Sequence, residues 1–138
     1  MRLPVVLLSL NALALGQRPV PIDNEWVKVI LVNSAPGRKT GLHEHAVNRV
    51  MIYLDPGSQR TAFESGRLEN LNWKAGDALW SRGGGKHIAE NLHASAYRIV
   101  EIELKKPGSG KLPALPLDPL KADPKRYKLE FENPQVRV

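Results

Sequence analysis

The stretch GLHEHAVNRVMIYLDPG, residues 41–57, joins two histidines to a strongly β-prone run that closes in an Asp-Pro-Gly turn. His43 and His45 stand one residue apart, and residues i and i+2 of a β-strand point to the same face. Both imidazoles would therefore project together, with Glu44 on the opposite side. A strand presents two ligands to one metal ion in this way. The stretch predicts a histidine pair that needs further ligands from elsewhere in the chain.

Composition and length are those of one globular domain. The chain has 138 residues, of which 42% are hydrophobic and 25% are charged. Eleven glycines and eleven prolines predict many turns and few long helices. The absence of cysteine from the sequence excludes disulfides, thiolate metal sites and a cysteine nucleophile.

Between residues 27 and 104, short β-prone segments alternate with turn signals such as Asp55-Pro56-Gly57. In the last segment Val100, Ile102 and Leu104 alternate with glutamates, which is the period of a half-buried strand. Eight or so short strands at regular spacing predict an all-β sandwich, barrel or jelly roll. The expected strands are 27–32, 42–45, 49–54, 60–63, 68–73, 78–81, 87–92 and 97–104.

The first sixteen residues, MRLPVVLLSLNALALG, have the features of a secretory signal peptide. A positively charged N-terminus precedes a short apolar run, and a plausible cleavage site made of small residues follows that run. The alternative is a buried first strand or helix of the domain. After this segment no stretch is apolar enough for a membrane helix, so we expect a secreted or periplasmic protein without a membrane partner.

The net charge of +6 is concentrated in one segment. Residues 105–128 carry seven Lys/Arg against two Asp, and they also hold five of the eleven prolines. A nucleic-acid surface would interleave basic and aromatic residues, but Tyr127 is the single aromatic residue of this segment. We therefore predict a solvated Pro-rich linker and no nucleic-acid partner.

The end of the chain repeats a pattern from its beginning. Residues 132–138, ENPQVRV, resemble residues 23–29, DNEWVKV, with three identities and two conserved charges. One interpretation is that residues 129–138 open a second copy of the domain. Others are that the last strand adds to the sheet edge of a partner subunit, or that the likeness is accidental.

A third histidine follows a glycine-rich turn in GDALWSRGGGKHIAEN, residues 76–91. Glycines let the backbone bend tightly and approach a neighbouring strand, so His87 can converge on the first two histidines. With both stretches the sequence resembles the cupin superfamily, whose fold is a double-stranded β-helix or jelly-roll barrel, here spanning residues 17–104. The resemblance rests on two motifs. The first comprises Gly37, His43, His45 and Gly57. The second comprises Gly76, Gly84, His87 and Asn91, with Arg82 at the position where proline is usual.

The resemblance implies a divalent metal bound by His43, His45 and His87, with zinc, iron, copper, nickel and manganese as candidates. The glutamate that completes the family's set is missing. Its position holds Arg49 by one spacing and Val50 by the other. Without it, either three histidines hold the metal, or a metal-poor pocket binds a small anion. Ligand-binding candidates are Arg49, Tyr53, Trp80 and Asn91, the last also suited to supporting backbone turns.

Two functions follow from this pocket. The first is a metal-dependent dioxygenase, isomerase or lyase that acts on a small organic, anionic ligand. The second is a non-catalytic anion-binding or structural module. The resemblance also implies a homodimer. Motifs of other chemistries are missing from the sequence, including a phosphate-binding loop, a nucleophile elbow and a pair of glycosidase-like acids.

Overall fold

The computed structural model describes residues 18–110 and 114–138, so the predicted signal peptide, residues 1–16, lies outside the described residues. Within those ranges no helix is long and apolar enough to cross a membrane. The described chain consists of short strands and one short helix: β1 (Ile22–Asp23), β2 (Val27–Ser34), β3 (Arg49–Tyr53), β4 (Gly57–Phe63), β5 (Leu68–Trp73), β6 (Ala78–Ser81), β7 (His87–Asn91), β8 (Tyr97–Leu104) and α1 (Pro119–Ala122).

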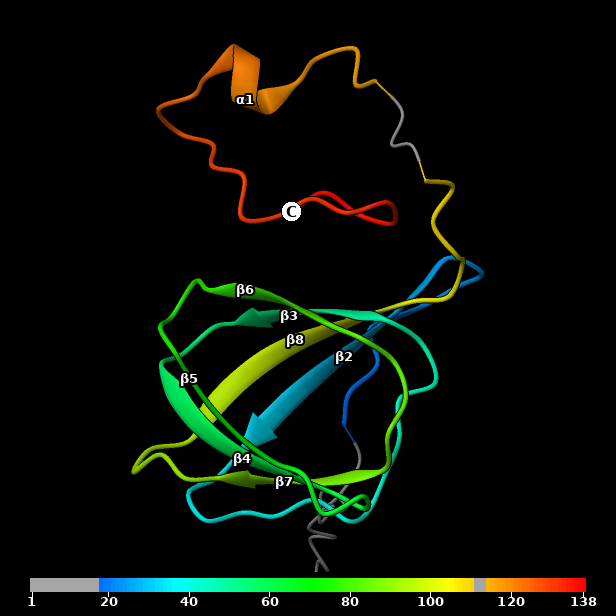
Figure 1. Cartoon of the computed structure of the whole chain (residues 1–138). Coiled ribbons are helices and arrows are strands. Elements are labelled where there is room, and N and C mark those ends of the chain that lie inside the picture. The colour runs from blue at the N-terminus through cyan, green and yellow to red at the C-terminus, as the bar shows by residue number, and fades with distance from the viewer. Residues whose placement is uncertain (1–17, 111–113) are drawn as a thin grey trace, which may run out of the picture.

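The strands form two antiparallel sheets that face each other (Figure 1). One sheet has the order β1-β2-β8-β3-β6 and the other the order β5-β4-β7. Because β2 pairs along its whole length with β8, the first long strand and the last lie side by side. This is the jelly-roll barrel predicted from the strand spacing, and the predicted fold class is confirmed.

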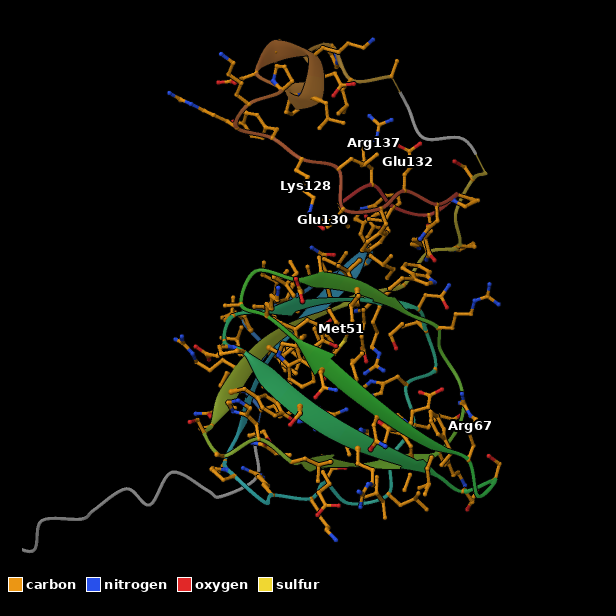
Figure 2. The ribbon with its side chains drawn as sticks, turned by 60° about the vertical axis from the view of Figure 1, so that its left-hand side comes forward. Met51, Arg67, Lys128, Glu130, Glu132 and Arg137 are labelled. Atoms are coloured by element: carbon orange, nitrogen blue, oxygen red, sulfur yellow. The ribbon has the colours of Figure 1, made fainter. Side chains whose placement is uncertain are left out.

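The core lies between the sheets and is largely aromatic. It comprises Met51, Tyr53, Trp73, Tyr97 and Ile99, and Figure 2 shows Met51 inside the barrel. The rings of Tyr53 and Trp73 pack with their centroids 4.4 Å apart. The indole Nε1–H of Trp73 donates to the carbonyl of Asp55 at 2.9 Å, so its one polar atom is satisfied on burial.

One predicted strand is absent, and one predicted strand face is reversed. Residues 42–45 form no strand, because they pair with β7 only through an isolated bridge between His43 and His87. In β8 the glutamate face turns inward: Glu101 is 5% exposed, whereas Val100 and Ile102 are only half-buried. The alternation correctly indicated a strand. Because the inside of the barrel holds a polar cavity, however, the glutamates of this strand point inward instead of the apolar residues that alternate with them.

The predicted linker, residues 105–128, contains the single turn of helix α1. The Asp118 side chain caps this helix by accepting from the Leu120 N–H, and Pro119 stands in the first turn, where its missing N–H costs nothing. That this segment separates two units stays a prediction.

The N-terminal hairpin, residues 22–29, is closed by an asparagine side chain. Asn24 Oδ1 accepts from the N–H groups of Trp26 and Val27, both at 2.9 Å. The Asn24 N–H donates to the Val27 carbonyl at 3.0 Å, and Asp23 pairs with Lys28 across the strands.

The C-terminal hairpin, residues 131–138, is closed in the same way. Asn133 Oδ1 accepts from the N–H groups of Gln135 and Val136 at 2.9 and 3.1 Å. The Asn133 N–H donates to the Val136 carbonyl at 3.0 Å, and Glu132 bridges Arg137. The likeness between the two segments therefore extends to local hydrogen bonding. That the C-terminal hairpin opens a second unit stays a prediction.

Gly57→Ala should destabilise the barrel, because a Cβ there would lie 2.7 Å from Cε2 of the buried Trp73 ring. Overpacking of this kind costs roughly 1–3 kcal/mol of unfolding free energy, measurable by urea denaturation. Gly41→Ala is the control, since a Cβ at Gly41 has no neighbour within 4 Å. Equal midpoints for the two variants would contradict the packing argument.

Candidate metal centre

Three histidines from two segments of the chain meet inside the barrel, two from the loop before β3 and one from the start of β7. Each of His43, His45 and His87 offers one ring nitrogen to a cluster whose atoms all lie within 4.8 Å of one another. His43 and His87 exchange backbone hydrogen bonds at 3.0 and 2.8 Å, which bring their ring centroids within 4.5 Å. The predicted convergence is thus present, although a single bridge and a loop achieve it in place of a strand.

All three imidazoles are held by the same ring atom. Nδ1 of His43 lies 2.9 Å from the Gly41 carbonyl, and Nδ1 of His87 lies 2.8 Å from the Gly85 carbonyl. A carbonyl oxygen can only accept, so in both rings Nδ1 carries the proton and donates it. The lone pair of each ring is then on Nε2, which is the arrangement of a metal-ligating histidine.

His45 is oriented by a carboxylate. Its Nδ1 lies 3.1 Å from Oε1 of Glu103 on β8, a pairing typical of metal-binding histidines. Its Nε2 is buried and has no hydrogen-bond partner among the described residues. A buried lone pair without a partner costs free energy, and a cation at the cluster would satisfy it. The donor set therefore fits a divalent ion.

Burial favours the neutral form of two of the imidazoles, those of His45 and His87. Desolvation lowers the pKa of His45 below its ordinary value of 6.5, against the opposing effect of the hydrogen bond that its Nδ1–H donates to Glu103. Burial likewise lowers the pKa of His87. Neutral imidazole is the form that binds a metal, so the pocket favours the ligating form at neutral pH.

The glycine turn of the second motif holds the cluster from behind. Gly84 donates its N–H to the His45 carbonyl at 2.7 Å, and both Gly84 and Gly85 have positive φ, which favours glycine. A Cβ at Gly83 would lie 2.7 Å from the backbone of Val47. This turn therefore approaches the first motif more closely than a side chain at Gly83 would permit.

Arg49 occupies the inward position at which the resemblance implies a glutamate, while Val50 points to the other face of β3. Arg49 is 7% exposed. It lies 3.5 Å from Glu101 and donates to Oγ of Ser81 at 2.9 Å. Arg18 lies 3.6 Å from the other oxygen of Glu101. One carboxylate thus serves two arginines, and this Arg18–Glu101–Arg49 cluster carries one positive charge in excess.

The histidines and Arg49 line a cavity of about 840 Å³, which is large enough for a small organic molecule. Five Lys/Arg residues and two glutamates line it, so its wall is positive. Tyr53 also lines it, and burial raises the pKa of that hydroxyl to about 12. Tyr53 therefore keeps its proton and can donate it in a hydrogen bond.

Two predicted ligand-binding residues have other contacts. Trp80 borders the cavity, but its ring lies edge-on to Phe131 of the C-terminal hairpin, with centroids 6.4 Å apart. Asn91 is fully buried and is not among the residues that line the cavity. Its amide donates to the Ser34 carbonyl at 2.9 Å and accepts from the His93 N–H at 2.7 Å. Asn91 thus supports two turns, the other role that its sequence position suggested, and a ligand contact for it stays a prediction.

Sequence reasoning missed Glu101, Glu103 and Arg18. The two glutamates share the parity of buried Tyr97 and Ile99 on β8, and that parity could have placed them inside. No local pattern marks Arg18, which reaches Glu101 only in the folded chain.

A cupin domain from Bordetella pertussis Tohama I is similar to this chain in sequence and fold. It is 29% identical with a TM-score of 0.60, and the alignment covers 65% of this chain and 93% of that one. The chain resembles the cupin superfamily in its fold and in the positions of its three motif histidines. The likeness agrees with the His43, His45 and His87 cluster, which occupies the positions at which the two cupin motifs have histidines.

Two solved structures of lower sequence identity share the fold. A double-stranded β-helix protein from Klebsiella pneumoniae is 21% identical with a TM-score of 0.53, and covers 64% of this chain and 76% of its own. An RmlC-like cupin from Methanocaldococcus jannaschii is 14% identical with a TM-score of 0.51, and the alignment covers 64% of this chain and 80% of that one. Neither a protein-family profile nor a curated protein matches the sequence.

The metal-free chain should lose unfolding free energy as the pH falls below 6.5, the ordinary pKa of histidine. In the folded state the pKa values of His45 and His87 are lower than this. Below 6.5 the unfolded chain therefore binds more protons, which favours unfolding. Urea midpoints in the presence of a chelator at about pH 7.5 and about pH 5.5 measure the effect.

The double variant His45→Gln/His87→Gln should flatten this pH dependence, whereas His93→Gln, which changes the histidine outside the cluster, should retain it. Identical midpoints for the parent chain at the two pH values would contradict the assignment.

Proposed function

We propose that this cupin-fold protein binds a divalent metal ion through Nε2 of His43, His45 and His87, and holds a small anionic organic ligand beside it. The supporting observation is that every Nδ1 is occupied by an acceptor. Each free lone pair is therefore on Nε2. Three neutral imidazoles suit zinc, iron, copper or nickel better than manganese, which prefers oxygen ligands.

Such an ion would supply Lewis-acid or redox chemistry at a coordination position left open by three protein ligands. The residues of the chain would bind and orient the ligand. The excess positive charge of the Arg18–Glu101–Arg49 cluster attracts an oxyanion, and the Tyr53 hydroxyl donates a hydrogen bond. Apolar side chains that line the cavity, among them Met51, Leu79 and Ile99, exclude water. A dioxygenase, isomerase or lyase is the class of enzyme that fits this pocket.

An anionic ligand is favoured by the charge balance. Three neutral imidazoles leave the full 2+ charge of an ion uncompensated, whereas a ligand set with a carboxylate would neutralise part of it. The lining adds five cationic residues against two acidic ones. A carboxylate on the ligand would balance this charge and could accept the paired N–H groups of an arginine.

A non-catalytic anion-binding module is the second candidate. The observation that favours it is Arg49, because a buried positive charge beside the histidines opposes the binding of a cation. Desolvation lowers the pKa of Arg49, yet a guanidinium in a protein keeps its proton. In this case the anion would bind without a metal.

The cellular setting rests on the sequence. Export to a secreted or periplasmic location is proposed from residues 1–16. Assembly as a homodimer is proposed from the resemblance to the superfamily.

The metal site is tested by the elemental content of the purified chain. The parent should hold near-stoichiometric metal after incubation with zinc or iron, and His43→Ala/His45→Ala/His87→Ala should hold none, because no other group of three or more His/Asp/Glu residues gathers within the described residues. His93→Ala is the matched control and should bind like the parent. A parent that binds none of zinc, iron, copper, nickel or manganese would sink the metal proposal and leave the anion-binding module.

The anionic ligand is tested by titrating malonate and succinate against malonamide and succinamide, with zinc and with a chelator. We expect the acids to bind and the neutral diamides not to bind. In Arg49→Gln/Glu101→Gln the affinity should fall about 10- to 100-fold, the effect of losing a hydrogen bond to a charged group. The double substitution avoids leaving one buried charge without its partner.

Arg60→Gln, on β4 but outside the cavity lining, is the control and should bind as the parent does. Equal binding of acids and diamides would contradict the proposed ligand class. If the acids bind as tightly in the presence of the chelator as in the presence of zinc, the metal-free anion-binding module is favoured over the metalloprotein.

A further inference from the structure

The C-terminal hairpin lies against the five-stranded sheet of the barrel (Figure 1), and Gln135 makes side-chain hydrogen bonds across this contact. Gln135 follows Pro134 in the turn of the hairpin. Its Nε2 donates to the carbonyl of Lys106 at 2.6 Å, and its Oε1 accepts from Nδ2 of Asn48 at 2.9 Å. Both ends of this amide are therefore used to hold the hairpin to the barrel.

Asn48 connects Gln135 to the glycine turn. While Nδ2 of Asn48 donates to Gln135, its Oδ1 accepts from the Gly83 N–H at 3.0 Å. Its own carbonyl accepts from the Leu104 N–H at 2.9 Å, which anchors Asn48 to the end of β8. One half-buried side chain thus bonds at once to the hairpin and to the turn.

The glycine turn that Asn48 holds positions two of the three histidines. Gly84 bonds to the His45 carbonyl at 2.7 Å, and the Gly85 carbonyl accepts from Nδ1 of His87 at 2.8 Å. Hydrogen bonds therefore run without a break from Gln135 through Asn48 to the turn that orients the cluster.

We propose that Asn48 and Gln135 are positioning residues through which the C-terminal hairpin holds the glycine turn, and with it His45 and His87, in the metal-binding geometry. The inference rests on the proposed metal site, and it adds a role for residues 131–138 that no motif assigns. Neither residue is among those that line the histidine cavity, so both act through the turn.

The hairpin is held by few contacts, so the connection can be broken without unfolding the barrel. A second cavity of about 460 Å³ lies between the hairpin and the barrel, lined in part by Asn48, Trp80 and Gln135. The hairpin carries its own internal bridge, in which Glu132 and Arg137 lie together (Figure 2). Its fold is therefore local, whereas its docking depends on the Gln135 amide, the Trp80–Phe131 contact and a close approach at Gly108.

The first test is amide hydrogen exchange in the metal-free full chain. Gln135→Ala should speed exchange at Gly83, Gly84 and Gly85 about fivefold, the effect of losing one hydrogen bond. Exchange in β8 should stay unchanged. Lys128→Ala is the matched control, since it removes an exposed ion pair with Glu130 on the same C-terminal segment (Figure 2), and it should leave the turn protected.

A second variant displaces the whole hairpin while leaving the side chains of Asn48 and Gln135 unsubstituted. A Cβ at Gly108 would lie 2.7 Å from the carbonyl carbon of Pro134. Gly108→Ala should therefore reproduce the faster exchange of the turn. The double variant Asn48→Ala/Gln135→Ala should speed exchange of the turn no more than the stronger of the two single variants does, because both residues act through one chain of hydrogen bonds.

The second readout is the metal itself. With cobalt as the probe, Gln135→Ala should shift the visible absorption spectrum and speed release of the ion to a chelator by roughly three- to tenfold, somewhat less than is typical for removing a direct partner of a ligand. Lys128→Ala should change neither property. A change in global stability alone would not move the spectrum.

The outcomes separate this inference from the proposed function. Faster exchange of the turn in Gln135→Ala supports the positioning role even if the parent binds no cobalt, in which case only the metal proposal fails. Unchanged exchange of the turn in both Gln135→Ala and Gly108→Ala overturns the inference, whatever the parent binds. Faster exchange throughout the barrel also overturns it, because the hairpin would then stabilise the fold as a whole.

Discussion

The pair of backbone hydrogen bonds between His43 and His87 is the constraint on which the site depends. Among the described residues it is one of two isolated bridges, the other being between Lys39 and Glu90, that join the loop carrying the first motif to the strand that begins with the second. Because the two residues exchange both bonds, their side chains leave the backbone side by side. The glycine turn, the Nδ1 acceptors and Glu103 then fix the rings that this bridge has brought together. Most of these partners are backbone groups, which makes the geometry resistant to side-chain change.

The most unusual feature of the pocket is its charge. A carboxylate that would neutralise part of a cation is replaced by Arg49, and the acid beside that arginine, Glu101, is shared between Arg49 and Arg18. Buried charges are tolerated only with partners, since desolvation otherwise outweighs attraction. Here the cluster keeps one positive charge in excess, which makes an anion the natural partner of the cavity. The two proposed functions differ in whether a metal ion adds to that charge.

Much of the fold and half of the site could be predicted from the sequence. Strand spacing and turn residues are local signals, and they located seven of the eight segments expected as strands. The prediction of a strand over residues 42–45 was wrong because alternation over four residues cannot show whether a partner strand continues beside them. The histidines were found because their spacing is local within each motif. Glu101 was missed because a polar residue on an alternating strand is ordinarily assigned to solvent, and only the cavity reverses that rule. The contact of Gln135 with Asn48 joins residues 87 positions apart, and no local pattern encodes it.

The pairing of β2 with β8 also has a consequence for how the protein forms. The barrel closes only when its first long strand meets its last, so closure must await synthesis of the chain as far as Leu104. The N-terminal hairpin, by contrast, involves neighbours in sequence and can form within microseconds. His43 and His45 emerge from the ribosome well before His87. The cluster of three histidines is therefore complete only after His87 has been synthesised, and any ion that it holds enters in whichever compartment the barrel closes.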